Sequence, residues 1–402
     1  MALLPLKQII GRRDSLIQRL SSVARDYAWG SHTLIPDHLN IESTGRPMAE
    51  IWFGTHPAWP TPLANEERSL EQLRNHQPLP FLLKFLAAEQ PLSIQAHPSK
   101  QQAEAGFAAE ESLGVPLDSP DRDYRDDNHK PEVIVALTPF KALIGFRPAS
   151  DIALSLQRLI LQAQQSDFTE LEARLADCLH TLRTRGLQAL FEELLGARGH
   201  LDQVTEQLSQ LAHLPIAVEN VETQNLLLVP QLQSLYPGDP GIIVAQLLNL
   251  VELHPMEAAE LPAGNVHAYI SGLGVELMAA SDNVLRGGLT PKRINVPELL
   301  KVVDFSLAGA PVLHGEQLAA GLWRYPTVAP DYLLYRIEVD GTRILADIKI
   351  ENAAIIACTA GEVAVGDSLG NREVLRAGQA AYLADARFYS FTGAGTAFLA
   401  TS

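Results

Sequence analysis

Two side chains that can bind a metal ion stand two residues apart in segment 90–100, which reads Gln-Pro-Leu-Ser-Ile-Gln-Ala-His-Pro-Ser-Lys. Successive side chains of an extended strand point to opposite faces, so Gln95 and His97 share one face with Ser93. The other face is apolar and carries Leu92, Ile94 and Ala96. An amide oxygen beside an imidazole is half of a metal site. Taken alone, the pattern is more typical of a half-buried strand with a hydrogen-bonded histidine.

Two further ligand types stand at the start of other predicted strands. Glu132 opens the apolar run 132–137, and His267 follows a proline- and glycine-rich turn. Together with Gln95 and His97 they supply two imidazoles, one carboxylate and one amide oxygen. This donor set suits a borderline divalent metal such as Zn²⁺, and an open coordination position would make the site catalytic. Other histidines compete for these roles, namely His32, His38, His56 and His254.

Charged residues close to these ligands could move protons or bind an anion. Lys84 interrupts the apolar run 80–88, where a lysine either snorkels or points into a cavity. His129 and Lys130 come just before Glu132, so we expect them at the rim of a cavity. Glycines and polar turn residues frame another group of charged residues, which contains Asp282, Arg286 and Lys292.

Three other side chains are candidates for sugar contacts. Trp29 precedes a glycine and could line a sugar site, although a buried tryptophan of the core is the commoner outcome. Tyr269 shares a strand face with His267. Glu276 shares a face with Met278 on the predicted strand 275–280.

The elements that must position these residues change type along the chain. Residues 1–20 are interpreted as an N-terminal extension with some helix. Strands and turns at 21–148 and 236–305 predict one catalytic domain, interrupted by leucines at helical spacing over 149–235. We expect this helical insertion to cover one mouth of the catalytic barrel. Short alternating runs at 306–402 predict a second β domain.

Composition excludes several classes of protein. The 402 residues are 47% hydrophobic and 19% charged, which fits a folded chain of more than one domain. The formal charge of −16 argues against nucleic acid or an anionic membrane as partner. No signal peptide or membrane span is predicted, and only 2 cysteines are present, so we expect a cytoplasmic protein.

Five segments in order resemble signatures of the type I phosphomannose isomerases. They are Met-Ala-Glu-Ile-Trp-Phe-Gly-Thr-His-Pro at 48–57, Pro-Leu-Ser-Ile-Gln-Ala-His-Pro at 91–98, His-Lys-Pro-Glu at 129–132, Leu-Pro-Ala-Gly-Asn-Val-His-Ala-Tyr at 261–269 and Ala-Ser-Asp-Asn-Val-Leu-Arg-Gly-Gly-Leu-Thr-Pro-Lys at 280–292. The resemblance extends over about residues 27–301. Ala28 and Ser99 depart from the acidic or amide residues expected in the family.

The resemblance implies a mainly β fold made of a cupin (jelly-roll) catalytic domain, an all-α inserted domain and a C-terminal β-barrel domain. It also implies one zinc ion per chain, bound by Gln95, His97, Glu132 and His267. The implied reaction interconverts mannose 6-phosphate and fructose 6-phosphate through an enediol. We expect a monomer whose partner is a small-molecule sugar phosphate.

Roles for the other side chains are assigned from their expected positions near these ligands. The proton-transfer candidates are Lys130, His129 and Asp282, with Lys84 in the barrel interior and Arg286 as a stabiliser of negative charge. For the phosphate we expect Arg286, Lys100 and Ser93, followed by Lys292. The sugar contacts expected are Trp29, Tyr269 and Glu276.

The alternative is a metal cupin that is not an isomerase, such as a sugar-binding module or an iron dioxygenase. Two histidines and one carboxylate also fit a ferrous site. The additional Gln95 and the rim of lysine and arginine residues favour the isomerase.

Overall fold

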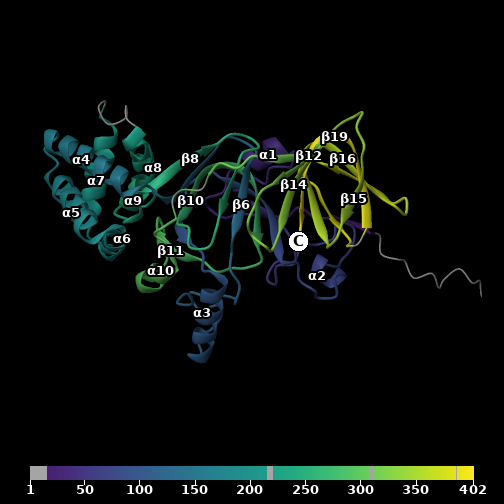
Figure 1. Cartoon of the computed structure of the whole chain (residues 1–402), viewed down its shortest axis with the longest axis horizontal. Coiled ribbons are helices and arrows are strands. Elements are labelled where there is room, and N and C mark those ends of the chain that lie inside the picture. The colour runs from purple at the N-terminus through teal and green to yellow at the C-terminus, as the bar shows by residue number, and fades with distance from the viewer. Residues whose placement is uncertain (1–15, 215–220, 308, 310, 386) are drawn as a thin grey trace, which may run out of the picture.

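The structure, a computed structural model, describes residues 16–214, 221–307, 309, 311–385 and 387–402. The rest of the predicted N-terminal extension and part of the predicted helical insertion therefore lie outside the described residues. The molecule is elongated, with a group of helices at one end, a β-rich middle and a second β-rich part at the other end (Figure 1). It is mainly β, as the sequence predicts.

Among the described residues, ten strands form the middle sheet, in the order β11-β5-β10-β4-β3-β2 with β6 and β7 also on β10. The strands are β2 (Ala24–Arg25), β3 (Glu50–Phe53), β4 (Phe81–Ala88), β5 (Ile94–Ala96), β6 (Glu132–Ala136), β7 (Phe140–Phe146), β8 (Leu248–Leu253), β9 (Ala258–Leu261), β10 (His267–Ala279) and β11 (Leu285–Gly288).

The long strand β10 holds this sheet together. Its first part pairs with β5 and β7, and its second part pairs with β4 and β6. The register shifts between Tyr269 and Ser271, and Gly272 follows with a φ of 121°. A Cβ at Gly272 would lie 2.7 Å from the carbonyl oxygen of Pro139, so glycine is required where the strand changes partners. The separate strand predicted from residue 275 is therefore wrong.

Alternation along β4 separates core from site. Phe81, Leu83, Phe85 and Ala87 belong to an apolar cluster that also contains side chains of the C-terminal sheet, such as Ile355 and Phe398. The intervening residues of β4 face the other way, and Lys84 is among them. The apolar residues anchor the strand, and the lysine ammonium is thereby fixed inside the middle sheet.

Helices occupy the chain between β7 and β8, where the helical period predicts them. They are α4 (Ala149–Gln165), α5 (Thr169–Arg185), α6 (Leu187–Gly196), α7 (Asp202–Ala212), η1 (Val221–Leu228), α8 (Val229–Leu235), α9 (Gly241–Val244) and η2 (Ala245–Leu247). Their core continues into Ile94, Ala96, Ala268 and Leu285 of the middle sheet.

These sheet residues alternate with Gln95, His267 and Arg286, so the helices pack on the face opposite to the chemical side chains. This differs from the expectation that they cover a mouth of the barrel. The apolar face of a short strand needs a core, and the helices supply it.

Two helices outside this group flank the site. The helix α3 (Lys100–Ser112) begins at the N-cap Ser99, whose hydroxyl accepts from the Gln102 amide in a capping box, as the Pro-Ser signal predicts. The helix α10 (Val296–Val302) follows β11. Helices α1 (Leu34–Leu39) and α2 (Leu70–Leu73) lie among the first strands of the chain.

The second sheet contains nine strands among the described residues. They are β1 (Ile17–Leu20), β12 (Glu316–Ala319), β13 (Leu322–Tyr325), β14 (Leu333–Asp340), β15 (Leu345–Ile350), β16 (Ala354–Asp367), β17 (Arg372–Arg376), β18 (Ala380–Leu383) and β19 (Arg387–Thr401). Within the described residues the pairings of either sheet run along an open path, and neither closes into the expected barrel.

The strand β1 replaces the helix expected near the N-terminus. It pairs antiparallel with β18 from Ile17 opposite Leu383 to Leu20 opposite Ala380. Ile17 and Leu20 are 5% and 3% exposed, and they belong to the apolar clusters on the two sides of the C-terminal sheet. Residues 17–20 are therefore an integral edge of that sheet.

We predict that Leu20→Ala lowers the free energy of unfolding by about 2–5 kcal/mol, because it removes a buried side chain from the contact between the two sheets. Urea unfolding followed by circular dichroism measures this. The control is Val23→Ala, whose side chain lies 48% exposed just beyond β1, with an expected change within about 0.5 kcal/mol. Equal unfolding midpoints for the two variants would contradict the assignment of β1 to the folded core.

Candidate metal and anion site

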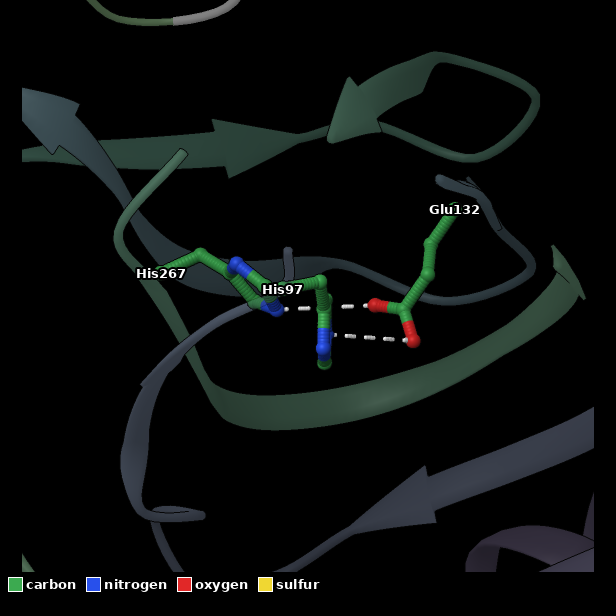
Figure 2. Close-up of side chains that lie close together, drawn as sticks. All are labelled: His97, Glu132 and His267. Carbon is green, nitrogen blue, oxygen red and sulfur yellow. Dashed lines mark ion pairs between the residues drawn. The ribbon is translucent and has the colours of Figure 1, made fainter. Parts of the chain in front are cut away.

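Three buried side chains converge at the start of β6 and β10 and just after β5, and Figure 2 shows them. The Nε2 atom of His97 lies 3.5 Å from Oε1 of Glu132, and that of His267 lies 3.4 Å from Oε2. The candidate ligand atoms all lie within 4.8 Å of one another. This is the grouping that the sequence predicts for three of its four metal ligands.

Backbone carbonyls orient both imidazoles. The Nδ1–H group of His97 donates to the carbonyl of Asn283 at 2.7 Å, and that of His267 donates to the carbonyl of Asn265 at 3.1 Å. Both Nε2 atoms are thereby left as acceptors that face Glu132. A metal-binding histidine usually donates its second ring N–H to such an acceptor.

Two buried atoms of the cluster lack a hydrogen bond, namely Nε2 of His97 and Oε2 of Glu132. Burial lowers the pKa of His97 to about 4, against the opposing effect of Glu132. Burial would raise the pKa of Glu132, but Lys130 and His97 hold it well below its usual range. A neutral imidazole and an ionised carboxylate are the forms that bind a metal, so these residues fit a divalent ion.

Gln95 completes the predicted donor set. Gln95 on β5 pairs with His267 on β10, and its side-chain amide nitrogen lies 3.3 Å from Nε2 of the His267 ring. On its other side Gln95 pairs with Arg286 of β11. Residues directly opposite in antiparallel strands share a face, so Arg286, Gln95 and His267 form one row across the sheet.

Next to this row lies a buried charged group. The ammonium of Lys84 lies 3.0 Å from Glu276 and 3.3 Å from Glu50. Burial would lower the pKa of Lys84, but Glu276 and Glu50 raise it, so the side chain is protonated at neutral pH. Burial raises the pKa of Glu276 against the opposing effect of Lys84. Sequence analysis missed Glu50, although a carboxylate inside the strand-like stretch 49–53 was a signal.

The predicted proton-transfer residues have partners of their own. Lys130 is 8% exposed, and its ammonium lies 3.1 Å from Glu132. The Nε2 atom of His129 lies 2.8 Å from Asp331 of the C-terminal part. Asp282 lies 2.9 Å from His56. Burial would raise the pKa of Asp282, but His56 and Lys130 lower it. The sequence analysis expects a pKa shifted toward neutrality, so the direction of the shift differs from that expectation.

A pocket of about 360 Å³ opens beside β11. Its charged lining consists of five cations and three carboxylates, namely Arg122, Arg125, Arg286, Lys292 and Arg293 with Asp121, Asp123 and Asp282. Burial and then Arg125 lower the pKa of Arg286, and Arg286 lowers that of Lys292. Among the described residues no carboxylate pairs with the Arg286 guanidinium. Cations that repel one another across a small pocket favour an anionic ligand.

Arg125 was missed because it lies in an acid-rich loop that reads as solvated. Its guanidinium donates to the carbonyls of Leu117 and Ser119, which hold it at the pocket wall. Only the folded loop brings this arginine next to Arg286.

Other predicted binding residues lie differently. The Lys100 ammonium is exposed on α3 and donates to the carbonyl of Asp127 at 2.9 Å, and it does not line the pocket. Ser93 is half-buried just before β5. Trp29 packs on the apolar cluster that contains Tyr269, and it stacks on Tyr27 with ring centres 5.8 Å apart.

Comparison with known proteins agrees with this geometry. Residues 17–149 match the family model described as the catalytic domain of type I phosphomannose isomerase. The chain is 35% identical to mannose-6-phosphate isomerase of Salmonella typhimurium, over 91% of this chain and 94% of that protein. The chain belongs to the phosphomannose isomerase family. It is 31% identical to mannose-6-phosphate isomerase of Homo sapiens, with coverage of 86% and 87%.

Solved structures of this family superpose on nearly the whole chain. A mutant of phosphomannose isomerase from Salmonella typhimurium matches with a TM-score of 0.86 at 32% identity, covering 96% of this chain and 100% of that one. A mannose 6-phosphate isomerase solved in its zinc-bound holo form matches with a TM-score of 0.84, at the same identity and coverage. Among the helices described here, none is long and apolar enough to cross a bilayer.

We predict that Arg286→Lys weakens the binding of inorganic phosphate by about tenfold, because a lysine keeps the charge but loses the planar fork that grips an oxyanion. Titration calorimetry or ³¹P NMR measures the dissociation constant. The control is Arg376→Lys on β17, an exposed arginine that pairs with Glu362 far from the pocket, and it should bind phosphate like the wild type. Unchanged affinity in Arg286→Lys would remove this side chain from the anion pocket.

Proposed function

We propose that the chain is a zinc-dependent aldose–ketose isomerase that interconverts mannose 6-phosphate and fructose 6-phosphate. The observation that carries the proposal is the buried His97–Glu132–His267 cluster, with both Nε2 atoms aimed at the carboxylate. The cationic pocket at Arg286, two strands away from His267, supports a phosphorylated substrate. The relatives named as mannose-6-phosphate isomerases give the same substrate.

Gln95, His97, Glu132 and His267 would hold one zinc ion per chain. Bound zinc would supply a Lewis acid that stabilises negative charge on the sugar oxygens. Glu132 is fixed by Lys130 at 3.1 Å, and the imidazoles are fixed by backbone carbonyls. The protein thus prepares the ligand geometry before the metal arrives.

The phosphate end of the substrate would lie in the pocket of Arg286, Arg125 and Lys292. Of the further phosphate contacts expected from sequence, Ser93 lies on the same stretch as Gln95, and Lys100 would have to leave Asp127 to take part. If loss of the Arg286 fork raises KM alone, ground-state binding is its role. Equal falls in kcat and kcat/KM indicate a transition-state role.

Isomerisation moves one proton between C1 and C2 through an enediol, so a base must take it and return it on one face of the sugar. We assign this step to Lys130 and Asp282. Asp282 would accept the proton as a carboxylate, although its lowered pKa makes it a weaker base, and Lys130 lies close enough to Glu132 to stabilise developing charge. His129, oriented by Asp331, would assist ring opening.

The remaining predicted residues would shape the sugar site. Glu276 and Tyr269 lie on the inner face of β10, and the pKa of Tyr269 is raised well above its ordinary value by burial. Lys84, held between Glu276 and Glu50, acts as a fixed positive charge rather than as a base. Trp29 would contribute the apolar wall beside Tyr269.

The proposed function also implies a division of the chain into domains. We assign residues 21–148 and 236–305 to a cupin (jelly-roll) catalytic domain, 149–235 to a helical insertion and 306–402 to a C-terminal β domain, joined by β1. A cytoplasmic location fits the two free, buried cysteines, Cys178 and Cys358. A monomer remains part of the proposal. The alternative, a sugar-binding module or iron dioxygenase on the same cupin site, does not explain the cationic pocket.

The deciding experiment is a coupled assay of mannose 6-phosphate turnover with and without a chelator. We expect activity that chelation abolishes and Zn²⁺ restores. His267→Ala should lose both zinc and turnover while its circular dichroism spectrum stays unchanged, because the apolar core lies on the opposite face. The control is His254→Ala, an exposed histidine outside the cluster. Full turnover after chelation would contradict the proposal, and oxygen uptake with ferrous iron would favour the dioxygenase.

The proton-transfer assignment has its own test in the exchange of the C2 proton of mannose 6-phosphate with solvent, followed by NMR. Lys130→Ala and Asp282→Asn should slow exchange by about 10²-fold or more with zinc still bound, as expected for lost acid–base catalysis. His129→Ala should mainly slow ring opening. The control is Lys141→Ala, an exposed lysine on β7 paired with Glu252. Normal exchange in both Lys130→Ala and Asp282→Asn would eliminate the assignment and leave the metal site standing.

A further inference from the structure

Asn283 lies between β10 and β11 and is completely buried, at 0% exposure. Its backbone carbonyl accepts the Nδ1–H of His97 at 2.7 Å. This contact decides which ring nitrogen of His97 faces the metal cluster. The position of that carbonyl is therefore part of the metal site, although Asn283 is not one of the ligands.

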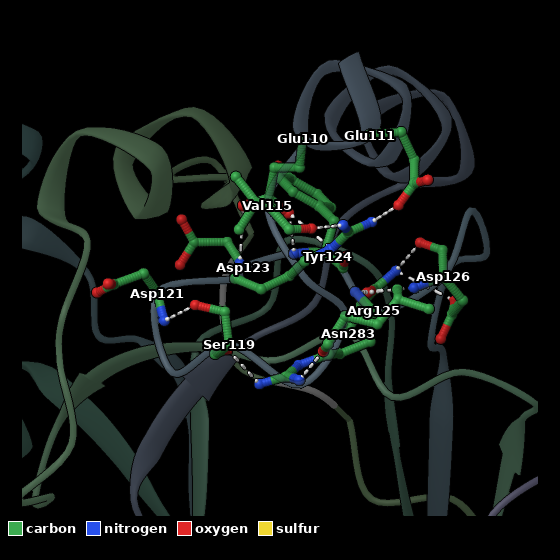
Figure 3. A network of polar contacts seen from close by, with 12 residues as sticks. Glu110, Glu111, Val115, Ser119, Asp121, Asp123, Tyr124, Arg125, Asp126 and Asn283 are labelled. Carbon is green, nitrogen blue, oxygen red and sulfur yellow. Dashed lines mark hydrogen bonds and ion pairs between the residues drawn. The ribbon is translucent and has the colours of Figure 1, made fainter. Parts of the chain in front are cut away.

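The side chain of Asn283 ties the same residue to the loop that runs from α3 to β6, as Figure 3 shows. Its Oδ1 atom accepts from the backbone amide of Arg125 at 2.6 Å and from that of Asp126 at 3.3 Å. Its Nδ2 group donates to the carbonyls of Asp126 and Asn128, both at 2.8 Å. Both ends of the amide are used, and a buried amide with such contacts fixes a single geometry.

Neighbouring residues extend this network. The Ser281 hydroxyl donates to Asp126 at 2.8 Å and accepts from the Asn283 amide at 3.2 Å. The Asp282 amide donates to the other oxygen of Asp126 at 2.7 Å. The turn before β11 and the loop after α3 are thus one hydrogen-bonded unit, and Arg125 of the anion pocket belongs to it.

The two ligand histidines differ in how the backbone holds them. His267 lies inside β10 and pairs with strands on both sides. Its acceptor is the carbonyl of Asn265, whose side-chain Oδ1 is buried without a hydrogen bond. His97, in contrast, lies one residue beyond β5, and its backbone contact among the described residues is a single hydrogen bond, in which its carbonyl accepts from the Gly264 amide at 2.8 Å. Fewer backbone hydrogen bonds hold His97 than hold His267, so the position of the His97 ring depends more strongly on the Asn283 carbonyl.

We propose that Asn283 is a positioning residue that holds the metal ligand His97 and the loop carrying Arg125 as one unit. The inference rests on the proposed metal site and deepens it. Removing the side chain frees the loop and lets the turn at Asn283 shift, and the Nδ1–H of His97 then loses its fixed acceptor. The metal site and the anion pocket should loosen together.

The test compares Asn283→Ala with Asn265→Ala. Both remove a buried asparagine side chain and keep the backbone carbonyl that faces a ligand histidine. Chelator competition should show zinc affinity reduced about 10- to 100-fold in Asn283→Ala and close to wild type in Asn265→Ala. Equal zinc affinities for the two variants and the wild type would overturn the proposal.

A second readout separates positioning from general destabilisation. In the metal-free protein, ¹⁵N spectra of the His97 ring should report the Nδ1–H tautomer in the wild type and a mixture of tautomers in Asn283→Ala. Hydrogen exchange at the Arg125 amide, which donates to Asn283, should accelerate in the same variant. A tautomer and an Arg125 exchange rate that both match the wild type would contradict the inference.

If Asn283→Ala does not fold, Asp126→Ala serves instead, because Asp126 is half-buried in the loop and contacts Asn283, Ser281 and Asp282. It should also weaken zinc binding, and unchanged affinity would count against the proposal. Wild-type zinc binding and mannose 6-phosphate turnover are measured separately. If Asn283→Ala binds zinc and turns over mannose 6-phosphate as well as the wild type does, this inference fails and the proposed function stands.

Discussion

The rest of the site depends on one buried negative charge, the carboxylate of Glu132, which is 2% exposed. An ionised carboxylate without water or a partner costs several kcal/mol, so the surrounding side chains must compensate it. Lys130 does so at 3.1 Å, and the two imidazoles present acceptor nitrogens where a metal ion would complete the set. The polar residues on the adjoining strands are arranged around this one charge.

Strand alternation is what allows such a charged interior to exist next to a large apolar core. On β5 and β11 every chemical side chain, such as Gln95 or Arg286, has neighbours that pack against the helices. On β4 the residues flanking Lys84 pack toward the C-terminal sheet. The helices and the second sheet stabilise the strands from outside, and in this way they contribute to the site without supplying its ligands.

The sequence predicts what depends on local pattern. Alternation and turn signals identified His97, Glu132 and His267, and helical periodicity located the start of α4 at Ala149. It could not predict what depends on distant pairing. The bend that lets β10 serve two sets of strands and the pairing of β1 with β18 are properties of the assembled sheets. Arg125 could not be recognised because Arg286, its neighbour in the pocket, lies far away in the chain, and the stretch around Glu50 did not reveal its contact with Lys84.

The charges buried in the middle sheet also bear on why a divalent ion suits this site. The carboxylates of Glu50, Glu132 and Glu276 lie with the ammonium groups of Lys84 and Lys130. Counting each of these groups in its ordinary charged form leaves one net negative charge. Burial, followed by the nearby carboxylates of Glu132 and Glu50, raises the pKa of Glu276 against the opposing effect of Lys84. A divalent cation would reverse the balance to one net positive charge, which would favour an anionic ligand. A monovalent ion would only neutralise the group, so a divalent ion is needed to give these buried residues a net positive charge.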